Sequence, residues 1–447
     1  MQQVRADARA WAVLGRNWYI ALRAHADLVV AGMLLLLLSG CEGQGFAPIS
    51  PEMIAQSTPT AAATSTIDLA AASTNRLLVI GEDGNLFTIR PDGSAPFTLT
   101  TDANVGRAYL QATWSSTGER IAWTVIERAS DGLHSALLTA RADGSDLTRI
   151  ETSFPPFYLY WSPDDTKVAY LSNWLGKRGQ TIALRIVNVA GGGADVTTIG
   201  WGQPFYFAWS PTGEQLITHA ANRRVALVTL ATGEMTVLTD SSANFAVPQW
   251  NAAANKLVYV TNSAGAPRLV LTDVEGENEQ LVANVKQDNT VSFGLNSTGA
   301  KLAFIETSAL IGFNSFGPLF LYDLEQDEYE QLATEPVVAF FWSPDGQSLL
   351  FLTAEAEPRH PWLRINIWDG ATVRQYNRFI PSGTFLRDYL RFADQYMQSM
   401  RFWAPDSSAF VYAGQSEDGA MGVWVQALDD DSPHRVAEGV LATWSPR

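Results

Sequence analysis

The stretch that decides the fold reads Trp342-Ser343-Pro344-Asp345-Gly346 and leads into the apolar run Ser348-Leu349-Leu350-Phe351. Proline sets φ at the first central position of a turn, while Asp and Gly tolerate the rest of the turn geometry. The tryptophan before the turn offers a large flat face that can pack between neighbouring sheets. The stretch therefore predicts a Trp-bearing strand, a tight turn and a second, apolar strand.

The same pattern recurs through most of the chain. Its tryptophan slot is occupied by Trp114, Trp161, Trp209, Trp250, Leu295, Trp342, Trp403 and Trp444. The intervals between slots are 47, 48, 41, 45, 47, 61 and 41 residues. After each pair of strands the sequence predicts two more, so that one unit holds four short strands. A period near 45 residues with four strands per unit is typical of a β-propeller.

The two ends of this repeat complement each other. The first unit has three predicted strands, at Leu77–Gly81, Asn85–Ile89 and Phe97–Thr100, and lacks a Trp strand. The last unit, Leu441–Pro446, is a Trp strand alone. We therefore predict an all-β, eight-bladed β-propeller over residues 76–447, closed by pairing of the C-terminal strand with the N-terminal three. Such pairing removes the last open sheet edge.

The Trp-Ser-Pro-Asp-Gly repeat resembles that of TolB-type propellers, which also occurs in prolyl-oligopeptidase-like peptidases. The resemblance covers about residues 76–447 and implies protein partners in a cell envelope. The sequence departs from both groups. We expect no α/β domain like that of TolB before the propeller, and the chain has no Gly-x-Ser-x-Gly nucleophile motif.

The amino terminus carries an export pattern. Four arginines precede an apolar run from Leu28 to Leu38, which is shorter than the roughly 20 residues that span a bilayer. The segment Leu38-Ser39-Gly40-Cys41 resembles the lipobox of bacterial lipoproteins. That resemblance implies a signal peptide over 1–40, cleavage before Cys41 and lipidation of its sulfur. Residues 41–75, rich in Ala, Ser, Thr and Pro, are predicted to be a flexible tether. The alternative is an uncleaved anchor with a buried cysteine.

The long interval of 61 residues contains an insertion at about 381–400. Its apolar residues are spaced by three and four positions, which predicts an amphipathic helix of about 16 residues. Two interpretations stay open. The helix packs on the propeller rim, or it is a lid or partner-docking element that presents Tyr389 and Tyr396.

Aromatic residues also gather where several Trp strands begin. They are Tyr109, Phe157, Tyr158, Trp201, Phe205 and Phe245. At a channel mouth, such residues would form an aromatic funnel able to stack sugar rings or hold peptide side chains. The alternative is that they pack between blades.

Composition narrows the function further. The 447 residues include 46 acidic and 30 basic side chains, so the net charge of −16 argues against nucleic acid as a partner. One cysteine excludes an internal disulfide, and the five scattered histidines predict no metal site and no cofactor. We expect a monomeric, lipid-anchored, extracytoplasmic propeller that is a non-catalytic protein-binding or scaffold module of the cell envelope, held on the membrane through Cys41. The alternatives are a glycan-binding propeller and a polysaccharide hydrolase or lyase.

Overall fold

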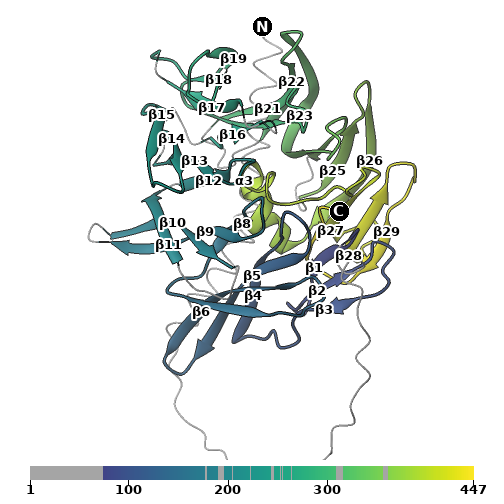
Figure 1. Cartoon of the computed structure of the whole chain (residues 1–447). Coiled ribbons are helices and arrows are strands. Elements are labelled where there is room, and N and C mark those ends of the chain that lie inside the picture. Colours follow the sequence, from purple (N-terminus) through teal and green to yellow (C-terminus); the bar gives the residue numbers. More distant parts are fainter. Residues whose placement is uncertain are drawn as a thin grey trace, which may run out of the picture.

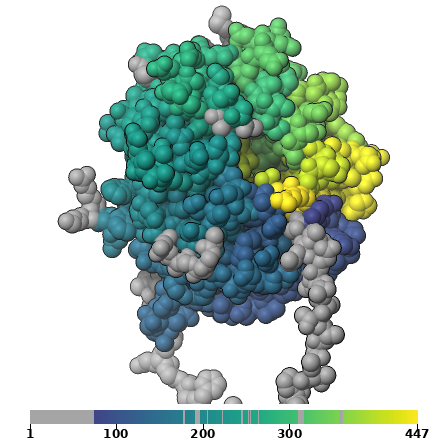
Figure 2. Space-filling model, viewed as in Figure 1, coloured from purple at the N-terminus to yellow at the C-terminus, as the bar shows by residue number. Residues whose placement is uncertain are grey.

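The chain folds into antiparallel sheets placed around a common centre. The computed structural model describes residues 74–176, 179–189, 196–203, 205–221, 223–242, 246–251, 253, 255–262, 264–308, 316–355 and 361–447. Over these residues the protein is all-β, with five four-stranded sheets, one ten-stranded sheet and one short helical segment. The sheets follow one another in chain order around a centre that contains α3 (Figure 1). The space-filling view from the same side shows a hollow at this centre (Figure 2).

Four of the five four-stranded sheets use consecutive strands. One contains β4 (Arg107–Trp114), β5 (Arg120–Ala129), β6 (Gly132–Arg141) and β7 (Thr148–Thr152). The next contains β8 (Phe157–Trp161), β9 (Lys167–Gly176), β10 (Gly179–Asn188) and β11 (Val196–Gly202). A third contains β12 (Phe205–Trp209), β13 (Gln215–Ala220), β14 (Arg224–Thr229) and β15 (Met235–Thr239). The fourth contains β16 (Gln249–Trp250), β17 (Leu257–Thr261), β18 (Arg268–Thr272) and β19 (Gln280–Asn284).

The ten-stranded sheet is three four-stranded groups joined through two long strands. Its strands are β20 (Asn289–Leu295), β21 (Lys301–Ser308), β22 (Gly317–Asp323), β23 (Glu328–Trp342), β24 (Leu349–Ala354), β25 (Leu363–Trp368), β26 (Val373–Pro381), β27 (Ala409–Gln415), β28 (Met421–Ala427) and β29 (His434–Ala437). The first part of β23 pairs with β22, and its last part pairs with β24. In the same way, β26 pairs with β25 and then, through its last two residues, with β27. Trp403 bridges to Phe410 of β27, and so supplies the fourth member of the last group.

The remaining sheet combines both ends of the described chain. Its strands in spatial order are β3 (Phe97–Thr98), β2 (Leu86–Ile89), β1 (Leu77–Ile80) and β30 (Leu441–Trp444). Leu77 pairs with Trp444 and Ile80 pairs with Leu441. Beyond the strand, the Arg76 backbone N–H donates to Ser445 Oγ at 2.9 Å. The first and last strands are therefore neighbours in one sheet.

In four copies, the tryptophan of the repeat connects one four-stranded sheet or group to the one before it. The indole N–H donates to a carbonyl of the preceding sheet or group, as Trp114 to Thr443 (3.3 Å), Trp209 to Tyr160 (3.0 Å), Trp342 to Gly294 (2.8 Å) and Trp403 to Phe341 (3.0 Å). Trp161 and Trp250 occupy the slot without an indole hydrogen bond to any described residue. The repeated tryptophan thus adds a directional contact to the packing that the sequence predicts.

The repeated turn has the predicted chemistry. Asp164 and Asp345 each accept a hydrogen bond from the backbone N–H two residues later, at 3.1 and 3.0 Å. The last turn position is left-handed, with φ of +70° at Gly346. A Cβ added to Gly346 would lie 2.5 Å from Ser297 Oγ of the neighbouring turn, so both backbone conformation and close packing favour glycine there.

The insertion is helical, but its predicted regular helix is wrong. It consists of a π turn η3 (Phe385–Tyr389), a 3₁₀ turn η4 (Leu390–Phe392) and one α turn α3 (Ala393–Tyr396). It lies at the centre of the sheets, not on their outer rim (Figure 1). Both Phe385 and Tyr396 are buried, in common with most apolar residues of the segment. A helix packed on several sides must fit several sheets at once, and these contacts override the local 3.6-residue period.

Candidate functional site

A pocket of about 310 Å³ lies between the insertion and strands of three sheets. One wall is the insertion, with Thr384, Arg387, Asp388, Tyr389, Phe392, Gln395 and Tyr396. The other wall is formed by Ile80 of β1, Leu110 and Gln111 of β4, and Phe157 and Tyr158 of β8. The volume is at the lower end of the range of about 300–1,000 Å³ that is usual for ligand sites.

Two β-bulges shape the strand side of this pocket. The register of β4 on β5 shifts between Leu110 and Thr113, and the register of β8 on β9 shifts between Phe157 and Tyr160. Inside these bulges Gln111 and Tyr158 have φ of +57° and +52°. Left-handed backbone at a non-glycine residue costs about 1–3 kcal/mol and is held in place only by surrounding contacts. The same distortion therefore turns one side chain of each strand toward the insertion.

Gln111 holds the site together through its side-chain oxygen. Gln111 Oε1 accepts from the Tyr158 backbone N–H at 2.9 Å and from the Tyr396 hydroxyl at 2.8 Å. Because a backbone N–H can only donate, the oxygen of the amide must face Tyr158. The Nε2 group of Gln111 then remains on the pocket wall without a hydrogen bond to a described residue.

A tyrosine cluster forms the floor of the site. The Tyr158 hydroxyl donates to the Gln395 carbonyl at 2.9 Å, and the Tyr158 and Tyr396 rings lie 5.3 Å apart, edge to face. The Tyr389 ring is 4.8 Å from Tyr396, and its buried hydroxyl makes no hydrogen bond of ordinary geometry to a described residue. Burial raises the pKa of all three phenols, so they stay neutral hydrogen-bond donors at physiological pH.

Two charged side chains enter the pocket from one turn. Arg387 and Asp388 are adjacent in η3, and both are half-buried. Within the described part of the chain, neither forms an ion pair or a hydrogen bond. Burial raises the pKa of the Asp388 carboxyl, and the charge of Arg387 partly opposes this rise. The pocket thus combines aromatic walls with one unpaired cationic and one unpaired acidic group.

The structure brings together only some of the residues that the sequence suggests. Phe157, Tyr158, Tyr389 and Tyr396 all line the pocket. Tyr109 is buried and donates to Asp102, Phe205 is buried within β12, and Trp201 is 68% exposed at the end of β11. Phe245 and Cys41 lie outside the described residues. These aromatics therefore do not form one continuous funnel, because strand alternation sends several of them into the packing between sheets.

Sequence reasoning missed Gln111, Arg387 and Asp388 as pocket residues. Arg387 and Asp388 fall in the predicted helix, but the expected polar face of a surface helix gives no reason to place them in a pocket. Gln111 lies in a strand whose bulge has no local sequence signal. Only the contact with the insertion, far along the chain, gives Gln111 its role.

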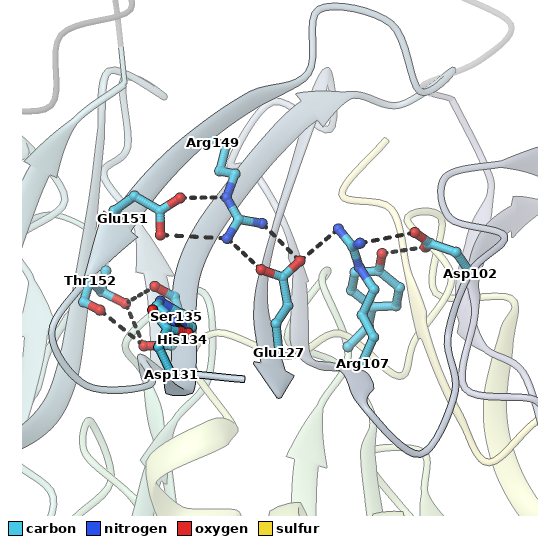
Figure 3. A network of polar contacts seen from close by, with 10 residues as sticks. Asp102, Arg107, Glu127, Asp131, His134, Ser135, Arg149, Glu151 and Thr152 are labelled. Atoms are coloured by element: carbon cyan, nitrogen blue, oxygen red, sulfur yellow. Dashed lines mark hydrogen bonds and ion pairs between the residues drawn. The ribbon is translucent and has the colours of Figure 1, made fainter. Parts of the chain in front are cut away.

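A network of charged side chains lies along the strands of the β4–β7 sheet (Figure 3). Arg107 contacts Asp102 at 3.2 Å and Glu127 at 2.8 Å, while Arg149 contacts Glu127 at 2.7 Å and Glu151 at 2.6 Å. Each guanidinium is thus shared between two carboxylates. The charges of these partly exposed groups are paired with one another. The network therefore orders the strand ends and leaves fewer unpaired groups for a ligand than the pocket does.

Among the described residues, no group of three or more His, Cys, Asp or Glu side chains is placed to hold a metal ion. Within the same ranges, no helix is both long and apolar enough to cross a membrane.

Comparison with known proteins identifies the fold class. The chain is similar to dihydro-heme d1 dehydrogenase NirN in complex with DHE, with a TM-score of 0.54 and 12% identity over 83% of this chain and 74% of that chain. It is also similar to the β-propeller domain of the Trilobed protease from Pyrococcus furiosus (TM-score 0.45, 12% identity, 75% of this chain and 99% of that chain). A third similar structure is TolB from Acinetobacter baumannii (TM-score 0.38, 16% identity, 68% and 82%).

Together with the succession of antiparallel sheets around one centre, the likeness to NirN makes the protein a β-propeller, as the repeat predicts. No protein-family model matches the chain. No curated protein matches it either. Because the identities are low, the likeness concerns the fold and leaves the activity to be inferred from the site.

Proposed function

We propose that this protein is a lipid-anchored, extracytoplasmic β-propeller that binds its ligand, without catalysis, in the pocket beside the insertion. In this proposal the sheets are eight blades, three of them contained in the ten-stranded sheet, and β30 closes the circle on β1. The insertion then plugs the central channel. Support comes from the β1–β30 register and from the four indole hydrogen bonds between successive four-stranded sheets or groups.

The observation that carries the proposal is the set of unpaired polar groups in an otherwise aromatic pocket. The charged groups of Arg387 and Asp388 and the Nε2 group of Gln111 lack hydrogen-bond partners among the described residues, although all three residues line the pocket. Polar groups in a partly buried site are costly unless they find hydrogen bonds. A ligand that supplies these bonds would be held there. Asp388 is the only acidic residue among the lining residues, whereas glycosidic cleavage normally uses two carboxyl groups.

Filling the pocket tests this proposal. Thr384→Trp places a bulky side chain at the pocket wall, and we expect it to abolish ligand capture in crosslinked pull-downs from intact membranes and on glycan arrays. Gly383→Trp is the matched control, because a Cβ added to Gly383 meets nothing within 4 Å. The control should retain capture. A folded Thr384→Trp variant that captures as well as the control would refute the pocket as the binding site.

Membrane attachment is tested separately at Cys41. The full-length protein should incorporate a labelled fatty acid and enter the detergent phase on phase separation, and Cys41→Ser should do neither. Each buried CH₂ of an acyl chain contributes about 0.8 kcal/mol to membrane binding, so loss of the chains removes the anchor. Ser57→Ala in the same predicted tether is the control and should stay labelled. Equal labelling of Cys41→Ser would contradict lipidation at this residue.

A second candidate function, docking of a protein partner, is favoured by a different surface. The hairpins β5–β6 and β9–β10 have strands of ten residues, against four to eight in the two middle strands of each other four-stranded sheet or group. Exposed apolar side chains lie near the ends of these hairpins, at Leu133 (69% exposed), Trp174 (39%) and Leu175 (71%), and on the neighbouring β11, at Trp201 (68%). Exposed patches of this kind often mark interaction sites. A protein captured equally by Thr384→Trp but lost from Trp201→Ala would favour this second function.

A further inference from the structure

The two charged residues of the pocket restrict the chemistry of its ligand. Arg387 offers only donors, and an ionised Asp388 offers only acceptors. They are neighbours in η3, yet they do not pair with each other in the described structure. Any group that binds between them meets a cation and an acidic side chain at the same time.

A ligand of single charge would suit only one of these residues. A carboxylate or phosphate would gain from Arg387 but meet the acid of Asp388, and an ammonium group would face the reverse conflict. A neutral hydroxyl avoids this conflict, because it accepts from the guanidinium and donates to the carboxylate. The Nε2 group of Gln111, which lines the same pocket, offers a further donor to a second hydroxyl.

The aromatic walls indicate that these hydroxyls belong to a ring. Phe157 and Phe392 both line the pocket, and Phe392 is 39% exposed. Neither ring is stacked on another aromatic ring within the described ranges, although the Arg391 guanidinium lies over one face of Phe392, 5.8 Å from the ring centroid. The C–H face of a sugar ring is apolar and packs on such a surface, while its hydroxyl edge stays polar. A volume of about 310 Å³ suits one ring rather than a chain of rings.

We propose that the pocket binds a single uncharged sugar ring, with hydroxyls between Arg387 and Asp388 and its apolar face on Phe157 or Phe392. This inference rests on the proposed function, since it assigns a ligand class to the same pocket. The ring would be either a free monosaccharide or the terminal residue of a neutral glycan. Both sources present the same hydroxyl pattern to the protein.

The test is a binding titration of the full-length protein in detergent. Glucose, galactose, mannose and N-acetylglucosamine are compared with galacturonate, glucosamine and free tryptophan, by calorimetry or by ligand-observed NMR. At least one neutral sugar should bind, and its charged counterpart should bind about tenfold more weakly, which is the effect of one unfavourable charged contact. A neutral oligosaccharide ending in the same sugar distinguishes the two sources: tighter binding than the free sugar indicates a glycan terminus.

Variants connect this binding to the named residues. Arg387→Met and Asp388→Asn should each weaken the neutral sugar about tenfold or more, with unchanged thermal unfolding. Arg223→Met is the control, because Arg223 is an exposed arginine that does not line the pocket. It should bind like the unmodified protein.

The outcomes separate the two proposals. If galacturonate, glucosamine or tryptophan binds better than every neutral sugar, and Arg387→Met or Thr384→Trp removes that binding, the ligand class is wrong but the pocket is the site. If no neutral sugar binds at millimolar concentrations, the inference is overturned. If capture of every ligand is unaffected by Thr384→Trp, the proposed function itself fails.

Discussion

Deletion of residues 441–447 should leave little folded protein at 37 °C. The deletion removes β30, whose four residues Leu441, Ala442, Thr443 and Trp444 are each at most 4% exposed. It also removes every residue pair on one side of β1, from Leu77–Trp444 to Ile80–Leu441. An open, apolar strand edge then faces solvent and invites aggregation. The free energy of unfolding of a protein domain is about 5–15 kcal/mol, so the loss of a whole buried strand removes a large part of this stability.

Single substitutions give this prediction a graded form. Trp444→Ala should lower the free energy of unfolding by about 3–5 kcal/mol, the usual cost of truncating a buried tryptophan. Its indole also donates to Asn75 Oδ1 at 2.8 Å, and that bond is lost. Trp201→Ala, at a 68% exposed position, is the control and should change stability by about 0.5 kcal/mol or less. Urea unfolding measures both. A deletion variant that unfolds at the same urea concentration as the intact chain would refute closure by β30.

Gln111→Ala should loosen the insertion and destroy the pocket. Alanine removes the oxygen that accepts from the Tyr158 N–H and the Tyr396 hydroxyl. Each donor left without a partner costs about 1–3 kcal/mol, so we expect a loss of about 2–5 kcal/mol in stability and a matching loss of ligand binding. Limited proteolysis should cut the chain within 381–400 sooner than in the unmodified protein.

Gln111→Gly separates the hydrogen bonds from the backbone strain. Both variants lack the acceptor, but glycine adopts the φ of +57° at this position without a steric penalty. Gln111→Gly should therefore be more stable than Gln111→Ala by roughly 1 kcal/mol, although less stable than the unmodified protein. If Gln111→Gly were less stable than Gln111→Ala, strain of the left-handed backbone at position 111 would not be a significant cost.

The contrast between Asp345 and Gln111 shows what sequence reasoning can reach. Asp345 accepts a hydrogen bond from a backbone N–H two residues away, so five consecutive residues are enough to predict its role in the turn. Gln111 forms hydrogen bonds with residues 47 and 285 positions away. Its backbone is left-handed, although glutamine is not a residue type that predicts this conformation, as glycine or asparagine would. The insertion was only partly predictable from the sequence. Its helical character follows from local periodicity, whereas its division into π, 3₁₀ and α turns follows from packing on several sheets at once.

The β-propeller fold follows from the amino-acid sequence alone, because a short turn and one tryptophan are local features that recur at intervals of 41 to 61 residues. The sequence also located the insertion and named four aromatic residues of the pocket. Only the tertiary structure decided that the insertion lies at the centre and that Arg387 and Asp388 face a pocket with Gln111. The site is built from two bulges and a segment far along the chain, so its geometry depends on how these parts pack against one another. No single stretch of the sequence encodes that packing.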